Sequence, residues 1–163
     1  MRAAPRNITT TRGIVEASGT YLLGQRSATN SNDTGKWEFL GGRPNPDESD
    51  AEALAREIHE EAGIYITPLL SGQRPSGNFV RPLRERDTGM YICRFFLVTG
   101  FSGEFDLDKN EVQEAAWFTP EQMLGLNMTD ASRSASKHLG KFSLDATIEL
   151  RWPPVTVFSL NRS

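Results

Sequence analysis

Several features of common functional sites are missing from this sequence. Cys93 is the only cysteine, so no disulfide can form within the chain, and we expect a buried, unreactive thiol in the apolar run around it. No CxxC pair, GxxxxGK[ST] phosphate loop or GxSxG elbow occurs. These absences argue against a zinc ribbon, a P-loop enzyme and a serine hydrolase.

Long apolar runs and an excess of positive charge are also absent. No run approaches the roughly 18 apolar residues of a membrane span, and residues 1–11 are polar, without the apolar segment of a signal peptide. We therefore expect a cytoplasmic protein without a membrane partner. The net charge of −3 provides no broad basic surface, so long nucleic acid is not an expected partner.

The composition is that of an ordinary globular domain. The chain has 163 residues, of which 37% are hydrophobic and 24% charged, enough for one domain with its own core. Because no repeat or low-complexity linker divides it, we predict a single domain over residues 1–163. Strand-like segments at 8–16, 20–26, 64–70, 78–83, 90–99 and 115–118, with an extended segment at 146–158, surround helical segments at 50–62, after 119, and at 131–141. This order predicts an α/β (α+β) domain with helices covering one mixed sheet.

The most clearly predicted helix runs from Asp50 to Ala62. Ser49 and Glu52 have the spacing of a capping box, and Gly63 follows as a stop signal. Small and apolar residues recur at helical spacing and predict the buried face of the helix. They are Ala51, Leu54, Ala55, Ile58 and Ala62.

Three glutamates on this helix predict a cation site. Glu57, Glu60 and Glu61 fall on one arc of roughly 100°, facing away from the predicted apolar face. Like charges at these spacings repel by about 0.2–0.5 kcal/mol per pair, and the helix dipole disfavours anions in the last turn. A bound cation reverses both penalties, whereas the alternative is a solvated acidic face.

The glutamates belong to a longer pattern, G-x5-E-x7-R-E-U-x-E-E-x-G-U, in which U is a bulky apolar residue. At about 5–7% usage per fixed residue, a chance match in a chain this long falls below about one in ten million. The matching residues are Gly42, Glu48, Arg56, Glu57, Ile58, Glu60, Glu61, Gly63 and Ile64. This pattern is the Nudix box, and through it the chain resembles the Nudix (MutT-like) hydrolases.

The box has a physical explanation in its own residues. The glycines Gly41 and Gly42 let a loop fold back closely over the helix. Arg56 is the expected partner of Glu48, in a fork-to-carboxylate pair that pins this loop to the helix. The alternative for Arg56 is a surface pair with Glu52, one helical turn earlier.

Segments outside the box extend the resemblance over roughly residues 8–128. Residues 22–26 and 37–39 look like the family's approach to its motif, and Glu111, six residues before Trp117, looks like its distal acidic residue. Glu114 is the alternative for that position. The resemblance implies a Nudix α/β/α sandwich with a mixed sheet, and a homodimer is possible because many relatives dimerise.

The resemblance also implies the chemistry and the residues that perform it. Glu57, Glu60 and Glu61 would bind Mg²⁺, or Mn²⁺, with the carbonyl of Gly41 and with Glu111. One of the glutamates would act as general base on the attacking water. Arg26 resembles an arginine that contacts substrate phosphates, with a plain surface charge as the alternative. Phe39 is a candidate for stacking on a base, with core packing as the alternative.

The sequence departs from the family at two positions that bear on specificity. Leu40 stands where a proline usually precedes the glycine pair, which is expected to change loop stiffness rather than chemistry. Some members read an oxidised purine with an asparagine from a C-terminal helix, and residues 129–160 contain no asparagine. That specificity is therefore not expected.

The sequence predicts an active pyrophosphohydrolase that cleaves a phosphoanhydride bond in a nucleoside diphosphate derivative or a (d)NTP. One alternative is a nucleotide-sensing module without turnover, against which the complete glutamate set argues. Another is an RNA 5′-pyrophosphohydrolase. The negative net charge argues mildly against it, and a basic segment leaves it open: Arg74, Arg81, Arg84 and Arg86.

Overall fold

A mixed sheet forms the centre of the molecule, for which a computed structural model describes residues 6–29, 32–69, 72–83 and 89–152. Its strands are β1 (Ile8–Ala17), β2 (Thr20–Arg26), β3 (Trp37–Glu38), β4 (Gly41–Gly42), β6 (Gly77–Pro82), β7 (Met90–Val98), β9 (Val112–Phe118) and β10 (Ile148–Leu150). The strand order is β10-β6-β7-β1-β2-β3, with β4 also paired to β1 and β9 to β2. β1 runs parallel to β7 and β10 parallel to β6, whereas the other pairs are antiparallel.

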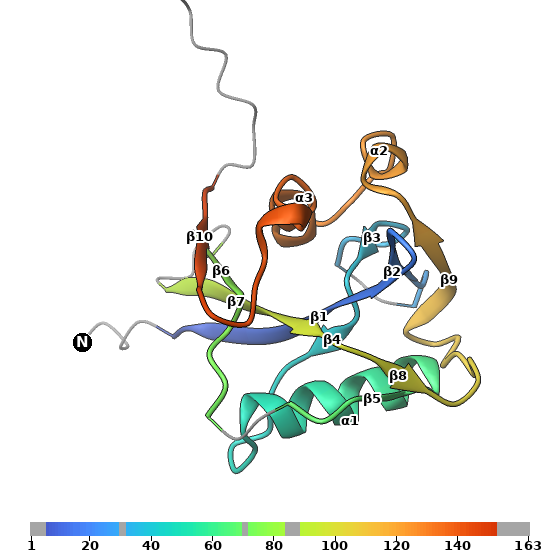
Figure 1. The fold of residues 1–163 in the computed structure, drawn as a ribbon, viewed down its shortest axis with the longest axis horizontal. Coiled ribbons are helices and arrows are strands. Elements are labelled where there is room, and N and C mark those ends of the chain that lie inside the picture. Colours follow the sequence, from blue (N-terminus) through green and yellow to red (C-terminus); the bar gives the residue numbers. More distant parts are fainter. Residues whose placement is uncertain (1–5, 30–31, 70–71, 84–88, 153–163) are drawn as a thin grey trace, which may run out of the picture.

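Helices cover the two faces of this sheet (Figure 1). On one side lie α1 (Asp50–Ala62) and a small sheet of β5 (Tyr65–Ile66) and β8 (Phe101–Ser102). On the other side lie α2 (Pro120–Met123), α3 (Asp130–Ser136) and a 3₁₀ turn (Leu139–Lys141). The predicted α/β fold with a mixed sheet is therefore confirmed.

Two apolar layers hold the sheet between its helices. Because successive side chains of a strand point to opposite faces, neighbouring residues of β1 and β2 enter different layers. Ile14 and Leu23 pack on the α3 side, and Val15 and Leu22 pack on the α1 side. Burial of each such side chain stabilises the fold by about 1.5–3 kcal/mol, so both faces of the central strands contribute.

The predicted bounds of α1 are confirmed, and its first turn differs in one detail. The Ser49 hydroxyl accepts from the Glu52 N–H at 3.1 Å, but the Glu52 carboxylate accepts from that same hydroxyl rather than from the Ser49 backbone. Gly63 ends the helix with φ 77°, the left-handed conformation that glycine adopts without strain. The second predicted capping box is complete, between Thr119 and Gln122.

The predicted buried face of α1 is confirmed for Leu54, Ile58 and Ala62 and is wrong for Ala51 and Ala55. Ala51 is only partly buried and Ala55 is exposed. The buried residues are Ala53, Leu54, Ile58, Glu61 and Ala62. Small size allowed Ala51 and Ala55 to fit an apolar stripe, but the larger Leu54 and Ile58 set the direction of packing. As a result, Glu61 faces the sheet instead of solvent.

Short elements account for most other differences from prediction. The strand predicted at 64–70 is reduced to β5, and β8 was not predicted, because two-residue strands arise from pairing rather than from a pattern. The helix predicted at 131–141 is divided into α3 and the 3₁₀ turn that contains Gly140, a residue of low helix propensity. Of the extended segment 146–158, β10 is observed, and 153–158 lie outside the described residues, as do Arg84 and Arg86.

Among the described residues, no helix has the length and apolar character required to cross a bilayer.

Candidate active site

β4 lies so close to its neighbours that both of its positions require glycine. Gly41 has φ 154°, and a Cβ there would collide with the carbonyl of Thr11. A Cβ on Gly42 would collide with the carboxylate of Glu57. The Gly41 N–H donates to Glu61 Oε2 at 3.3 Å. The glycine pair therefore places the β4 backbone directly against two glutamates of α1.

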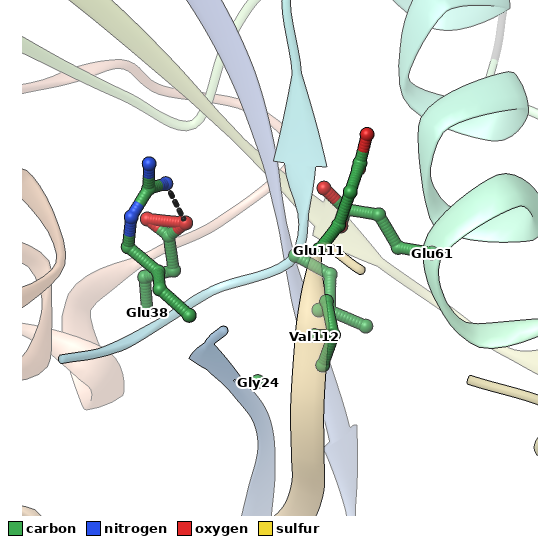
Figure 2. Close-up of a pocket in the computed structure, with 7 residues that line it drawn as sticks. Gly24, Glu38, Glu61, Glu111 and Val112 are labelled. Carbon is green, nitrogen blue, oxygen red and sulfur yellow. Dashed lines mark hydrogen bonds and ion pairs between the residues drawn. The ribbon is translucent and has the colours of Figure 1, made fainter. Parts of the chain in front are cut away.

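Three carboxylates meet at this point. Glu57, Glu61 and Glu111 each offer an oxygen atom, and these atoms lie within 4.8 Å of one another. Figure 2 shows Glu61 reaching from α1 toward Glu111, which lies just before β9. A recess of about 20 Å³ beside Glu61 and Glu111 has room for one water-sized species. Hard oxygen donors of this kind suit Mg²⁺ or Mn²⁺.

The cluster is electrostatically unfavourable without a cation. Burial raises the pKa of Glu61 well above its ordinary value, with Glu38 and Glu57 adding to the rise and Arg12 opposing it. Burial also raises the pKa of Glu57, although Arg56 opposes that rise. A divalent cation would favour the ionised form of both carboxyl groups. The donor set therefore fits the metal that the sequence predicts.

Two acidic candidates lie outside the cluster. The side chain of Glu60 is 55% exposed, and its Oε2 accepts from Arg56 Nη1 at 3.1 Å. Glu114 is exposed and lies opposite Gln25 in the β2–β9 pairing. Of the two candidates for the distal acid, only Glu111 is brought to the cluster. Metal ligation by Glu60 and by the Gly41 carbonyl stays a prediction.

Arg56 and Glu48 form the pair that the box predicts. Arg56 Nε lies 2.7 Å from Glu48 Oε2, and Nη2 lies 2.8 Å from Oε1. Nη2 also donates to the carbonyl of Arg43 at 3.1 Å, which ties the loop to α1. Arg56 and the N–H of Asn45 lower the pKa of Glu48 to about 2. The alternative partner, Glu52, is instead bonded to Ser49 at the start of the helix.

The two predicted substrate contacts have different environments. Arg26 Nη1 donates to Glu38 Oε1 at 2.8 Å, and its side chain lines the cleft beside the glutamates. Phe39 is fully buried, packs edge-to-face on Phe95 with ring centroids 5.9 Å apart, and donates its N–H to Ser132 Oγ. A ring enclosed in this way presents no face to a base. The placement of Phe39 thus matches core packing, the alternative reading of this residue.

Arg12 is a site residue that the sequence analysis did not identify. It is 7% exposed, its Nη1 donates to the Phe39 carbonyl at 2.9 Å, and Nη1 lies 3.2 Å from Glu38 Oε1. Burial alone would lower the pKa of Arg12, but the attraction of Glu38 and other neighbours outweighs burial and raises it. The sequence held one signal for this residue. Arg12 lies two positions before the apolar Ile14 in a predicted strand, so both side chains point to the same, inward face.

These groups line one cleft of about 630 Å³. One end is formed by the three carboxylates Glu57, Glu61 and Glu111. Four arginines also line the cleft: Arg12, Arg26, Arg43 and Arg81. Acidic groups that fit a cation, with arginines in the same cleft, favour a ligand that carries phosphate groups.

Comparison with known proteins shows the family of the chain. The family model of the NUDIX domain matches residues 8–139. A CTP pyrophosphohydrolase of Escherichia coli is 38% identical over 112 residues, 68% of this chain and 75% of the relative. The nucleoside triphosphatase NudI of an Enterobacter species is 29% identical over 123 residues, 74% of this chain and 87% of the relative.

The fold comparison gives the same result. A crystal structure of a MutT NUDIX hydrolase from Burkholderia pseudomallei has a TM-score of 0.69 with 22% identity, and the match covers 81% of this chain and 97% of that one. Identity at that level supports a shared fold alone, whereas the family model spans most of the chain and includes the glutamates of α1 and Glu111. The chain belongs to the Nudix family of hydrolases, enzymes that act on phosphorus-containing acid anhydrides.

Proposed function

We propose that this enzyme is a Mg²⁺-dependent pyrophosphohydrolase that converts a nucleoside triphosphate into a nucleoside monophosphate and pyrophosphate. The observation that carries the proposal is the carboxylate cluster of Glu57, Glu61 and Glu111 in a cleft that arginines also line. Within the wider predicted class of (d)NTPs and nucleoside diphosphate derivatives, the names of the relatives favour triphosphates.

The carboxylate cluster would hold the cation. Glu57, Glu61 and Glu111 supply the oxygen ligands, and Glu60, whose Oε2 accepts from Arg56, is a further predicted ligand. When bound, Mg²⁺ or Mn²⁺ supplies charge neutralisation of the phosphates and lowers the pKa of a coordinated water. The Gly41 N–H fixes the Glu61 carboxylate by donating to Oε2, so this ligand is oriented before the substrate arrives.

Arginines of the cleft position the phosphate groups. Arg26 and Arg43 line the cleft from the strand and the loop that flank the carboxylates, and Arg12 lies buried behind them. Glu38 Oε1 accepts a hydrogen bond from Arg26 Nη1 at 2.8 Å and forms an ion pair with Arg12 Nη1 at 3.2 Å. This shared carboxylate holds the two guanidinium groups in place, so that fewer degrees of freedom are lost on binding.

We assign the proton-accepting role to Glu111. The carboxylates of Glu57 and Glu61 are already engaged, by Arg56 and by the Gly41 N–H respectively. Glu111 is exposed at the mouth of the cluster, where it can accept the proton of the attacking water and release it to solvent.

A substrate panel tests the proposal. The protein is incubated with CTP, UTP, ATP, GTP, nucleoside diphosphate sugars, ADP-ribose, NADH and 5′-triphosphate RNA, with Mg²⁺ or with chelator, and products are separated by chromatography. We expect metal-dependent formation of a nucleoside monophosphate and pyrophosphate from at least one triphosphate. Cleavage of RNA alone would favour the 5′-pyrophosphohydrolase instead. Raised melting temperatures without any cleavage would favour a sensing module.

A further inference from the structure

Glu111 is carried by a short turn between β8 and β9. The N–H groups of Glu111 and Val112 both donate to the carbonyl of Asp108, at 3.0 and 2.8 Å. The Asp108 carboxylate accepts from the N–H of Asn110 at 3.0 Å. The conformation of this turn is therefore fixed by its own backbone and by one of its side chains.

One side of the turn is bound to the end of α1 (Figure 1). The Asp108 N–H donates to the carbonyl of Glu61 at 2.9 Å, and the Asp106 N–H donates to that of Ala62 at 2.8 Å. These bonds satisfy carbonyl groups that the last turn of a helix leaves without a partner in the helix. Because Glu61 is itself a member of the carboxylate cluster, the turn is held next to a carboxylate that Glu111 must meet.

The other side of the turn is bound to Ser27, the residue that follows β2. The Ser27 N–H donates to the Glu111 carbonyl at 3.0 Å, and the Ser27 hydroxyl donates to the carbonyl of Asn110. Ser27 is only 2% exposed, and the exposed Thr29 donates its hydroxyl to the same Asn110 carbonyl. Ser27 thus binds the peptide groups on both sides of the Glu111 Cα, which fixes the direction of that side chain.

A β-bulge brings Glu111 to this position. Two successive residues of β2 pair with residues two apart on β9, which leaves Gln113 as an extra residue. The carbonyl of Gln113 accepts from Lys109 Nζ at 2.9 Å. The extra residue shifts the preceding chain by one position, so that Glu111 rather than its neighbour comes beside Ser27. The two pairs are Gln25–Glu114 and Arg26–Val112.

The carboxylate of Glu111 depends on its backbone more than that of Glu61 does. Glu61 is buried in the protein, and its carboxylate accepts from the Gly41 N–H. The side chain of Glu111 is exposed, so packing contributes less to its orientation. A fixed backbone at Glu111 reduces the freedom that this ligand loses when a cation binds.

We propose that Ser27 is a positioning residue, which holds Glu111 where its carboxylate completes the cation site. Ser27 does not line the cleft, so it acts through Glu111. The inference rests on the proposed function, because Glu111 must bind the cation. Loss of the Ser27 hydroxyl should therefore weaken cation binding only while residue 111 is a glutamate.

Titration with Mn²⁺ in the absence of nucleotide, followed by the electron paramagnetic resonance of free Mn²⁺, tests this dependence. We expect Ser27→Ala to bind Mn²⁺ about tenfold more weakly than the wild type, as for loss of a group that orients a ligand. In the Glu111→Gln background, the same change should alter the affinity by less than about twofold. Thr29→Val removes the exposed hydroxyl on the same carbonyl and should weaken binding by a smaller factor.

Ser134→Ala is the matched control. Ser134 is also buried, and its hydroxyl donates to a backbone carbonyl outside the cluster, that of Arg151. This change should leave the Mn²⁺ affinity at the wild-type value. An unchanged affinity in Ser27→Ala, an equal loss in Ser134→Ala, or a loss of the same size in the Glu111→Gln background would overturn the inference. If melting shows Ser27→Ala to be unfolded, Thr29→Val in the two backgrounds decides, and an unchanged affinity there overturns the inference.

Turnover separates this inference from the proposed function. If triphosphates are hydrolysed, Ser27→Ala should lower kcat with Mg²⁺ about tenfold and change KM by a smaller factor, and Glu111→Gln should remove this difference. If no triphosphate is cleaved but the Mn²⁺ affinity depends on Ser27 only when Glu111 is present, the proposed function fails and the positioning stands. Hydrolysis together with an unchanged Mn²⁺ affinity in Ser27→Ala would overturn the positioning alone. No saturable binding of Mn²⁺ by the wild type would also overturn the positioning, because no cation site would remain for Glu111 to complete.

Discussion

The two ends of the cleft are built in opposite ways. At the acidic end, like charges are crowded together, and Glu57 and Glu61 come from one helix at a spacing of four residues. At the other end, a positive and a negative side chain from Arg81 and Asp130, 49 residues apart in sequence, stand 3.6 Å from each other. The first arrangement is electrostatically unfavourable until a cation binds, whereas the second pairs opposite charges within the chain itself. The two ends of the cleft therefore differ in whether their charges are compensated by the chain.

The same difference explains what could be predicted from the sequence. The acidic end follows from helical spacing and the Nudix box, so Glu57, Glu61 and the Glu48–Arg56 pair could be identified from local pattern alone. Other contacts depend on strand pairing. Arg12 and Glu38 meet through the pairing of β1, β2 and β3, and Arg81 meets Asp130 through the docking of α3 beside β6 (Figure 1). No local periodicity contains that information.

Even at the acidic end, the sequence could not determine side-chain direction. The helical wheel placed Glu60 and Glu61 on one solvent-facing arc, but the packing of Leu54 and Ile58 turns Glu61 into the sheet and leaves Glu60 with Arg56. A rotation of the helix by a fraction of a turn decides which glutamate is buried. That rotation depends on the volumes of the packed side chains and not on their spacing.

Removal of Arg12 should produce the largest effect, because Arg12 lies between the two ends. Arg12→Met leaves the Glu38 carboxylate and the Phe39 carbonyl short of a buried donor. We expect the free energy of unfolding in urea to fall by about 3–5 kcal/mol, as for a broken buried ion pair. The control Arg94→Met breaks the partly exposed pair with Asp50 and should cost about 0–1 kcal/mol. Equal losses would show that burial of Arg12 carries no special role.

Neutral variants at the acidic end should abolish most turnover. Glu57→Gln and Glu61→Gln each remove a charged ligand of the cluster, and we expect kcat to fall by at least about 100-fold while the protein stays folded. Glu52→Gln, an exposed change on the same helix, is the control and should keep wild-type activity. An unchanged kcat in Glu61→Gln would remove the metal-site assignment.

Variants of Glu60 and Glu111 test which carboxylates act at the acidic end of the cleft. Helical spacing predicts that Glu60→Gln also lowers turnover by at least about 100-fold, whereas the contact of Glu60 with Arg56 predicts a smaller loss than in Glu61→Gln. Parallel assays rank the two variants. Glu111→Gln, just before β9, should lower activity more than Glu114→Gln within β9, because only Glu111 lies in the cluster. A reversed order would move the distal acid to Glu114.

Stability and activity should change in opposite directions at Glu61. Because burial raises the pKa of Glu61, its ionised form destabilises the metal-free protein at neutral pH. Glu61→Gln should therefore stabilise the metal-free protein by on the order of 1 kcal/mol, which raises Tm by about 2–4 °C. Mg²⁺ should raise the Tm of the wild type more than that of the variant. A lower Tm for the metal-free variant would contradict this balance.

The smallest effect concerns the loop that carries Glu48. Because its pKa falls from 4.5 to about 2 in the folded chain, the pair with Arg56 stabilises the fold fully above pH 4.5 and loses that contribution as the pH falls toward about 2. The Tm difference between the wild type and Glu48→Gln should narrow over this interval. A pH-independent difference would contradict an ionic pair. Arg56→Ala should lower both Tm and activity; a loss of activity alone would argue against its role in holding the loop.

Binding of Mn²⁺ tests the central claim, that the acidic end is a divalent-cation site, most directly. Free Mn²⁺ is followed by its electron paramagnetic resonance signal during titration of the wild type, Glu61→Gln and the control Glu52→Gln, without nucleotide. We expect saturable binding by the wild type and the control, and affinity at least about tenfold weaker in Glu61→Gln. Identical isotherms for Glu61→Gln and the wild type would contradict it.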